Sequence, residues 1–233
     1  MNPVEMNFYG FTLLEPLTSL TDITTGLLSI FLSNRLRTKT HHSKSRKLFF
    51  YYFLFTGIAT FCGGLFGHAL LYYISWNWKV LGWIFGAIGL FFLENATIAF
   101  FNQVLRQNII SLLRTITVVQ LLVYIATTFF KETRVFESVT INATFGYVLV
   151  IIPIFVYAGF SLKNRESWGV IFAIGLAALT GFIYTNGISI NAWFNHHVLT
   201  HLAMSVFVFV MYVAVNRLLN SKIKVEQLKT EYL

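Results

Sequence analysis

Residues 195–219 read NHHVLTHLAMSVFVFVMYVAVNRLL and carry the pattern that decides the fold class of the chain. The run is apolar almost throughout and has the length of about 20 residues that a membrane-spanning helix needs. At its start His197 and His201 stand four residues apart, so a helix places both imidazoles on one face, one turn apart. Because histidine is costly inside a membrane and tends to mark a functional position there, this stretch predicts a membrane helix that opens on a site.

The composition of the whole chain is that of a membrane protein. Of its 233 residues, 56% are hydrophobic and only 11% are charged, against about 25% charged residues in soluble domains. The net charge is +8, but Lys and Arg stand in blocks between apolar runs. That pattern suits contact with the anionic lipid headgroups of a bilayer and not with nucleic acid. We therefore expect a multi-pass integral membrane protein of the cell membrane.

Seven segments have the length and apolarity of membrane helices. The connections between them are short, which favours one compact bundle. We therefore predict an all-α fold in which residues 1–233 form a single seven-transmembrane helix domain, with a short solvated tail from about residue 218. The segments are residues 9–32, 48–74, 80–101, 109–130, 144–162, 168–188 and 195–219.

Basic residues gather in alternate loops. The loops after the first and fifth segments and the C-terminal tail hold several Lys and Arg residues and the loop after the third holds Arg106, whereas the other loops hold only Lys79, a balance of basic residues and Glu, or no charge. By the positive-inside rule, this pattern predicts an N-terminus outside and a C-terminus in the cytoplasm, which an odd number of spans also requires. The basic residues on the predicted cytoplasmic side are Arg35, Arg37, Lys39, Lys44, Arg46, Lys47, Arg106, Lys163, Arg165, Arg217, Lys222, Lys224 and Lys229.

A third histidine, His68, lies in the second segment at the same expected depth as the pair in the seventh. The helical rise places His68 and His201 about 10 Å below the outer ends of their segments, with His197 slightly shallower. Three neutral imidazoles with an open fourth position form a catalytic zinc arrangement, so zinc is the predicted metal. Two alternatives stay open. Each histidine could form a separate hydrogen bond within the bundle, or His68 and one of the pair could hold a haem.

This arrangement resembles the CREST superfamily of seven-helix membrane hydrolases, which includes the alkaline ceramidases and the progestin and adipoQ receptors. The shared features are seven helices, a histidine near the outer end of the second, and a His-x-x-x-His that opens the seventh. The stretch Glu15-Pro-Leu-Thr-Ser-Leu-Thr-Asp22 is similar to the ceramidase stretch in which a glutamate opens a polar run. The resemblance implies that His68, His197 and His201 are zinc ligands.

The N-terminal Glu5-Met6-Asn7 is similar to the Glu-x-Asn of the ceramidase calcium site. Hard cations such as calcium take oxygen ligands from carboxylates and amides. The resemblance therefore implies calcium bound near Glu5, Asn7 and Glu15.

Two positions depart from the family pattern. The family serine four residues before the second-helix histidine is Gly64 here, and the aspartate near the start of the third helix has only Asn77 in its place. Asparagine cannot act as a general base, so either another carboxylate takes over or the chemistry is altered or lost. The candidate catalytic carboxylates are Glu15, at the depth of the histidines, and Asp22, expected about two turns deeper. The alternative roles are packing or calcium binding for Glu15 and an interhelical hydrogen bond for Asp22.

The leading functional hypothesis is a zinc-dependent hydrolase that cleaves an amide bond of a ceramide-like membrane lipid, or an ester bond. Zinc would polarise the carbonyl and supply hydroxide at neutral pH. The alternative is a non-enzymatic heptahelical receptor or a membrane protein that metal stabilises, which the two departures favour. A retinal protein is disfavoured because the seventh segment has no lysine for a Schiff base. A transporter is disfavoured because the two halves show no internal repeat.

Overall fold

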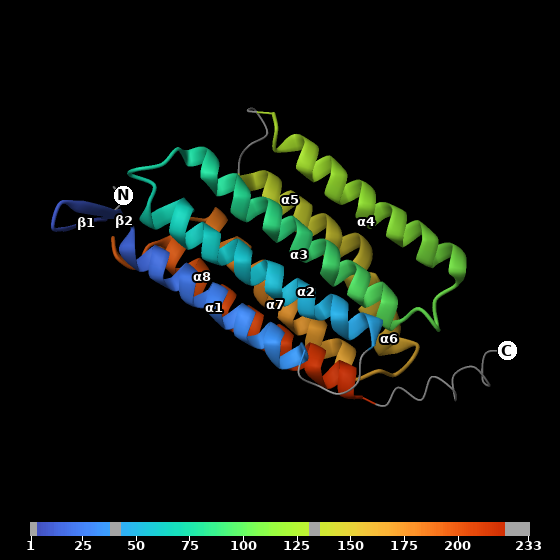
Figure 1. The fold of residues 1–233 in the computed structure, drawn as a ribbon. Coiled ribbons are helices and arrows are strands. Elements are labelled where there is room, and N and C mark those ends of the chain that lie inside the picture. The colour runs from blue at the N-terminus through green and yellow to red at the C-terminus, as the bar shows by residue number, and fades with distance from the viewer. Residues whose placement is uncertain (1–3, 38–42, 131–135, 222–233) are drawn as a thin grey trace.

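A bundle of long helices makes up the protein, as the computed structural model in Figure 1 shows for residues 4–37, 43–130 and 136–221. Helix covers 79% of the structure, which confirms the all-α prediction. The α2 helix ends in a π-helical turn at Gly63–Ala69, and a π-helical turn at Tyr147–Ile151 joins α5 to α6 in one bent stretch. The helices are α1 (Pro16–Arg37), α2 (Lys44–Cys62), α3 (Lys79–Phe100), α4 (Gln107–Thr127), α5 (Phe136–Gly146), α6 (Ile152–Phe160), α7 (Glu166–Thr185) and α8 (His196–Asn220).

Six of the helical stretches among the described residues are long and apolar enough to cross a membrane. Their positions agree with the second to seventh predicted segments, but the fifth begins earlier than expected, since Glu137 is already helical. Residues 222–233, which hold most of the predicted tail, lie outside the described part of the chain. The spans are Lys44–Ala69, Trp76–Phe100, Gln107–Thr127, Glu137–Phe160, Glu166–Thr185 and His196–Asn220.

The start of the first predicted segment is wrong. The chain forms an antiparallel β-hairpin of β1 (Glu5–Phe8) and β2 (Phe11–Leu14) instead of a helix from residue 9. Tyr9 and Gly10 both have positive φ angles, 47° and 86°, which is the conformation of the two-residue turns that favour tight hairpins. Helix α1 begins only at Pro16, a residue that suits the first position of a helix because its missing N–H needs no partner there.

Helix α1 is more polar than the other long helices and is not among the six spans. It packs against α2 and α8. Most of its Ser and Thr side chains are buried in the bundle: Ser29 Oγ donates to the Phe53 carbonyl at 2.7 Å, and the hydroxyls of Thr25 and Ser205 lie 2.5 Å apart. Three large apolar side chains on α1 are more than half exposed: Leu20, Leu27 and Phe31. A helix at the surface of a water-soluble bundle would bury such side chains and expose its polar ones.

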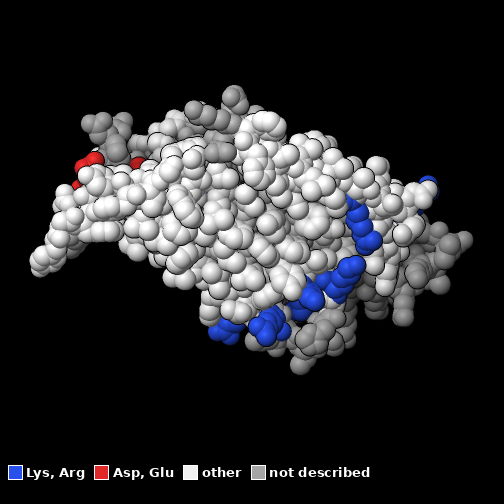
Figure 2. Space-filling view, turned by 45° about the horizontal axis from the view of Figure 1, so that its top comes forward, with Lys and Arg blue, Asp and Glu red and all other residues white. Residues whose placement is uncertain are grey.

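Lys and Arg side chains gather towards the end of the molecule opposite the β-hairpin, as Figure 2 shows. The antiparallel course of the helices brings the end of α1, the start of α2, the α3–α4 and α6–α7 loops and the end of α8 to this end. We call it the basic end. Lys39 and the tail lysines lie outside the described residues. The described basic residues of these segments are Arg35, Arg37, Lys44, Arg46, Lys47, Arg106, Lys163, Arg165 and Arg217.

Candidate metal centre

His68 lies in the π-helical turn Gly63–Ala69 that ends the second helical stretch, at the end of the bundle near the β-hairpin. A turn of this kind inserts one extra residue into a helix and often marks a functional site. Gly64 in the same turn allows α1 to come close, because a Cβ there would stand 2.8 Å from the Ser19 carbonyl oxygen and from Ile23 Cγ1. Ser19 Oγ donates to the Gly64 carbonyl at 2.9 Å. The turn and α1 are thus in direct contact next to His68.

His197 and His201 lie in the first two turns of α8. The helix is capped by Asn195, whose Oδ1 accepts a hydrogen bond from the Val198 N–H at 3.1 Å. This cap starts the helix immediately before the histidines, which satisfies a backbone donor that would otherwise have no partner. The ring centres of His197 and His201 lie 5.4 Å and 5.6 Å from that of His68. The i, i+4 pair and the histidine of the second helical stretch therefore meet, as the sequence predicts.

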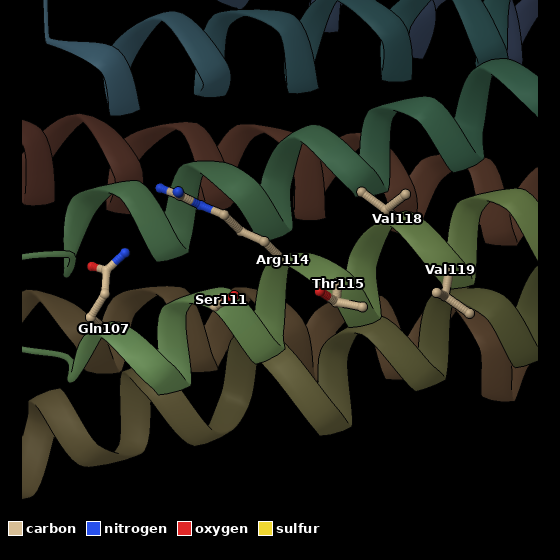
Figure 3. Close-up of a pocket in the computed structure, with 6 residues that line it drawn as sticks. All are labelled: Gln107, Ser111, Arg114, Thr115, Val118 and Val119. Atoms are coloured by element: carbon tan, nitrogen blue, oxygen red, sulfur yellow. The ribbon is translucent and has the colours of Figure 1, made fainter.

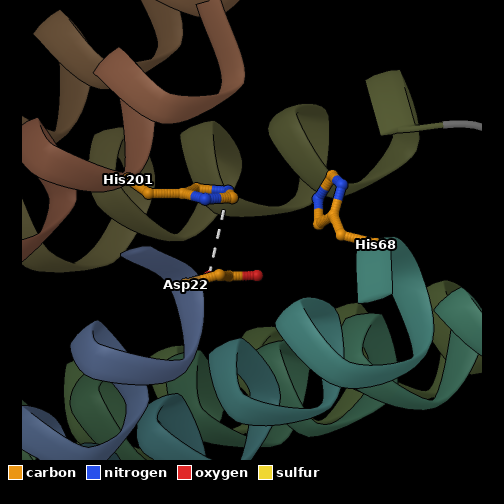
Figure 4. Close-up of side chains that lie close together, drawn as sticks. All are labelled: Asp22, His68 and His201. Carbon is orange, nitrogen blue, oxygen red and sulfur yellow. Dashed lines mark ion pairs between the residues drawn. The ribbon is translucent and has the colours of Figure 1, made fainter. Parts of the chain in front are cut away.

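Asp22, His68 and His201 form the group that could hold a metal ion among the described residues. One ligand atom from each lies within 4.8 Å of those of the other two. Figure 4 shows the Asp22 carboxylate and both imidazoles converging from α1, the π-helical turn and α8. Nε2 of His201 lies 3.8 Å from Oδ1 of Asp22. These three side chains are therefore placed so that they could hold a metal ion, and their positions do not identify the metal.

An acceptor at or just before the start of α1 contacts Nδ1 of His68, and another contacts Nδ1 of His201. Nδ1 of His68 lies 2.6 Å from Oε2 of Glu15, and Nδ1 of His201 lies 3.3 Å from the Thr18 carbonyl oxygen. A backbone carbonyl only accepts, so His201 carries its proton on Nδ1 in the neutral form. Such contacts fix the tautomer and the ring orientation of metal-binding histidines. They leave Nε2 of each ring as the nitrogen that can bind an ion.

Glu15 stands in the segment before α1, with Asn195 Nδ2 3.5 Å from its Oε1. Burial disfavours its charged form, but the hydrogen bond with His68 and the electrostatic interactions with His68, His197 and the Lys79 ammonium hold the pKa of the Glu15 carboxyl below its ordinary value. An ionised Glu15 is the acceptor that a histidine donating through Nδ1 requires.

Gly63 makes room for the Asp22 carboxylate. A Cβ at position 63 would lie 2.6 Å from Oδ2 of Asp22, and the next nearest atom would be Asp22 Cγ at 3.6 Å. Any other residue at position 63 would have to displace the carboxylate. The two small residues Gly63 and Gly64 therefore shape the site, in addition to their role in helix packing.

The structure places the predicted residues as follows. His68 and His201 belong to the group, and His197 lies beside it with its ring also near those of His196 and Tyr184, at 4.1 Å and 5.6 Å. Its role as a ligand stays a prediction. Asp22 is not too deep for the site, because α1 starts at Pro16 and not at residue 9, which leaves Asp22 less than two turns from the start of the helix. The sequence does not predict the contact of the Thr18 carbonyl with His201, since a backbone group leaves no trace in the residue pattern.

The predicted calcium ligands lie on the hairpin and next to it. Asn7 Oδ1 accepts a hydrogen bond from Thr12 Oγ1 at 2.9 Å, and Glu15 contacts His68. Glu5 pairs with Leu14 in the hairpin ladder. The side-chain oxygens of Asn7 and Glu15 thus have protein partners, and the calcium site stays a prediction.

The two positions at which the sequence departs from the CREST pattern are Gly64 and Asn77. Position 64 cannot carry a serine at the present spacing of α1 and the π-helical turn, as the contacts of a Cβ there with Ser19 and Ile23 make clear. Asn77 lies in an exposed 3-10 turn at Trp76–Trp78, where its backbone N–H bonds to Ser75 Oγ. A carboxylate near the histidines comes from α1 instead, as Asp22.

A protein-family model matches most of the chain. The model of a family described as "Family of unknown function (DUF6962)" matches residues 17–220, which include the three residues of the metal group. No curated protein and no solved structure shows significant similarity to the chain.

Proposed function

The chain belongs to this family of unknown function, DUF6962, and we propose that it is a seven-span membrane protein that binds zinc and hydrolyses an amide or ester bond of a membrane lipid. The proposal rests first on one relationship. Nε2 of His201, which holds a lone pair when Nδ1 donates to Thr18, faces Oδ1 of Asp22 at 3.8 Å. Two electron-pair donors in a buried place repel each other unless a cation or a proton donor stands between them.

Zinc fits the donor set. Two imidazoles bound to one zinc ion at 2.0–2.1 Å in tetrahedral geometry have ring centres about 5 Å apart. The ring centres of His197 and His201 lie 5.4 Å and 5.6 Å from that of His68. We assign the three histidines as the zinc ligands. Imidazole ligands suit zinc better than calcium or magnesium, which prefer oxygen.

The seventh span in this proposal is α1. Its mean hydropathy excludes it from the six apolar spans, but most of its Ser and Thr side chains are buried, whereas Leu20, Leu27 and Phe31 are exposed. A helix with this distribution buries its polar groups inside the bundle and offers apolar surface to lipid, as a membrane environment demands. Seven spans would put the β-hairpin and the basic end on opposite sides of the membrane, with the basic end in the cytoplasm.

The residues around the zinc ligands can support hydrolysis. When bound, zinc polarises a carbonyl group and makes water more acidic. The carboxylate of Asp22 reaches the group from α1 and accepts the proton of the attacking water. Asp22 thus takes the role of the CREST aspartate, whose place in this chain is held by Asn77. Glu15 keeps His68 in the required tautomer through its contact with Nδ1. A substrate that reaches this site from the bilayer is a lipid. The resemblance to the CREST superfamily favours a ceramide-like amide.

A second candidate function is a receptor or a structural protein that metal stabilises without catalysis. Gly64 and Asn77 favour this second function, because the serine and aspartate that the CREST hydrolases carry at those positions are absent from this chain. Both functions share the zinc site and differ only in turnover.

Elemental analysis of the purified protein, joined to a lipid assay, tests both. We expect about one zinc ion per chain and release of fatty acid from a short-chain ceramide or an acyl ester probe. His68→Ala, His197→Ala and His201→Ala should each lose zinc. Full metal content in His197→Ala would reject the three-histidine site, and zinc without turnover of either probe would favour the receptor.

A further inference from the structure

Arg114 is a charged residue inside a candidate membrane span. Helix α4 starts at Gln107, and the helical rise places Arg114 about 10 Å along it. The residue is half-buried, and no hydrogen bond or ion pair of its guanidinium occurs among the described residues. Charged groups at such depth normally pair with a group of opposite charge. The protein itself, as far as it is described, provides no partner for this one.

The side chain opens onto a groove of about 340 Å³ along α4. Figure 3 shows Arg114 reaching back along the helix towards Gln107, while Val118 and Val119 lie further along in the opposite direction. The groove is thus polar and basic over its first half and apolar over its second. Its lining residues are Gln107, Ser111, Arg114, Thr115, Val118 and Val119.

The polar half of the groove lies towards the basic end of the bundle. Arg106 directly precedes α4, and the α6–α7 loop with Lys163 and Arg165 belongs to the same end. Basic residues at this end of a membrane protein attract anionic lipid headgroups. A long arginine side chain extends from membrane depth towards the interface while its aliphatic part stays in apolar surroundings. The orientation of Arg114 brings its guanidinium towards the level of lipid phosphates.

We propose that this groove binds an anionic phospholipid of the leaflet at the basic end. The phosphate contacts Arg114 and Ser111, and an acyl chain lies along Val118 and Val119. The planar guanidinium matches a phosphate with two parallel hydrogen bonds, which makes arginine the preferred partner of this group. The groove pairs its polar half with the headgroup and its apolar half with the chain. The binding site is separate from the metal group and does not depend on zinc.

Native mass spectrometry of the full chain with phosphatidylglycerol and with phosphatidylcholine of the same acyl chains tests the proposal. We expect one retained phosphatidylglycerol and little phosphatidylcholine. Arg114→Gln should weaken phosphatidylglycerol binding about tenfold, since one charge-assisted phosphate contact is lost. Arg114→Lys keeps the charge without the two-pronged geometry, and its affinity should fall between those of the wild type and Arg114→Gln.

Two further variants separate the groove from general surface charge. Arg106→Gln removes the same charge from the exposed start of α4, outside the groove, and should weaken binding much less than Arg114→Gln does. Val119→Trp fills the apolar half and should also weaken binding. Equal losses in Arg106→Gln and Arg114→Gln, equal binding of the two lipids, or unchanged binding in Arg114→Gln would overturn the proposal. The melting temperature in detergent should be close to that of the wild type in all four variants, which confirms that they are folded.

Discussion

Nδ1 of His68 lies 2.6 Å from Oε2 of Glu15, so a carboxylate before α1 orients a histidine that lies 53 residues further along the chain. Outer partners of this kind raise the basicity of a histidine ligand and hold its ring in place, and their loss costs about 10–100-fold in metal affinity. We predict a loss of that size in Glu15→Gln, measured by zinc competition with a chromogenic chelator. Glu5→Gln on β1 is the matched control and should bind zinc like the wild type, unless the carboxylates act only through net charge.

Asp22 is predicted to act in turnover and not as an essential ligand. Asp22→Asn should keep zinc with at most about a tenfold loss of affinity, yet lower the hydrolysis rate by about 10²–10⁴-fold, the usual contribution of a general base. The two measurements are zinc titration and release of fatty acid from the probe lipid. A variant as deficient in zinc as His201→Ala would instead make Asp22 a ligand.

Gly63→Ala tests whether the space for the Asp22 carboxylate is needed. The added Cβ would come within 2.6 Å of Oδ2 and meet no other residue within 4 Å. We therefore expect impaired zinc binding or turnover with a near-normal melting temperature. Gly86→Ala in α3 is the control, because its Cβ would meet only Ala59 Cβ at 3.8 Å. If both variants behave like the wild type, the position of Asp22 is not important to the site.

Glu94 is a fully buried carboxyl on α3 that faces the bent α5–α6 stretch. A substitution that crowds it should lower the stability of the fold at a place far from the metal group. A Cβ at Gly146 would overlap Glu94 Oε1 and approach Gln120 Nε2 to 3.2 Å. Overpacking of this kind typically costs about 1–3 kcal/mol. Gly146→Ala should lower the melting temperature in detergent, with zinc still bound.

The matched control is Gly181→Ala on α7, where a Cβ would meet no atom within 4 Å. The double variant Gly146→Ala/Glu94→Ala removes the overlapping carboxyl, so its two effects should not add. Additive losses in the double variant would show that Gly146 acts through another contact.

The proposed topology is tested by single cysteines in a Cys62→Ser background. Tyr9, at the hairpin turn, and Ile190, between α7 and α8, are exposed, as is Lys163 at the basic end. If α1 crosses the membrane, an impermeant maleimide should label Tyr9→Cys and Ile190→Cys on intact cells. Lys163→Cys should react only after permeabilisation. Labelling of Tyr9→Cys from the cytoplasmic side alone would remove α1 from the spans.

Apolar length predicted the presence of six of the long helices, because desolvation of a helix depends mainly on its own residues, but it placed the start of the fifth too late, since the span begins at Glu137. The same criterion failed at the N-terminus. The strand β2 contains Phe11, Leu13 and Leu14 and is as apolar as the first turn of a membrane helix. Only the turn at Tyr9-Gly10 shows that these residues form a strand. Hydropathy does not distinguish these two structures, whereas a local turn signal does.

By itself, the sequence determined the helices, the basic end, and the i, i+4 spacing that puts His197 and His201 on one face of α8, since all three follow from local composition and the period of the helix. Only the tertiary structure decided which groups surround His68. The Glu15 carboxylate, the Thr18 carbonyl and Asp22 reach the histidines because α1 packs directly on the π-helical turn, where Gly63 and Gly64 provide the space. Such contacts depend on how closely helices approach and how they are rotated, which residues far apart in the chain settle together.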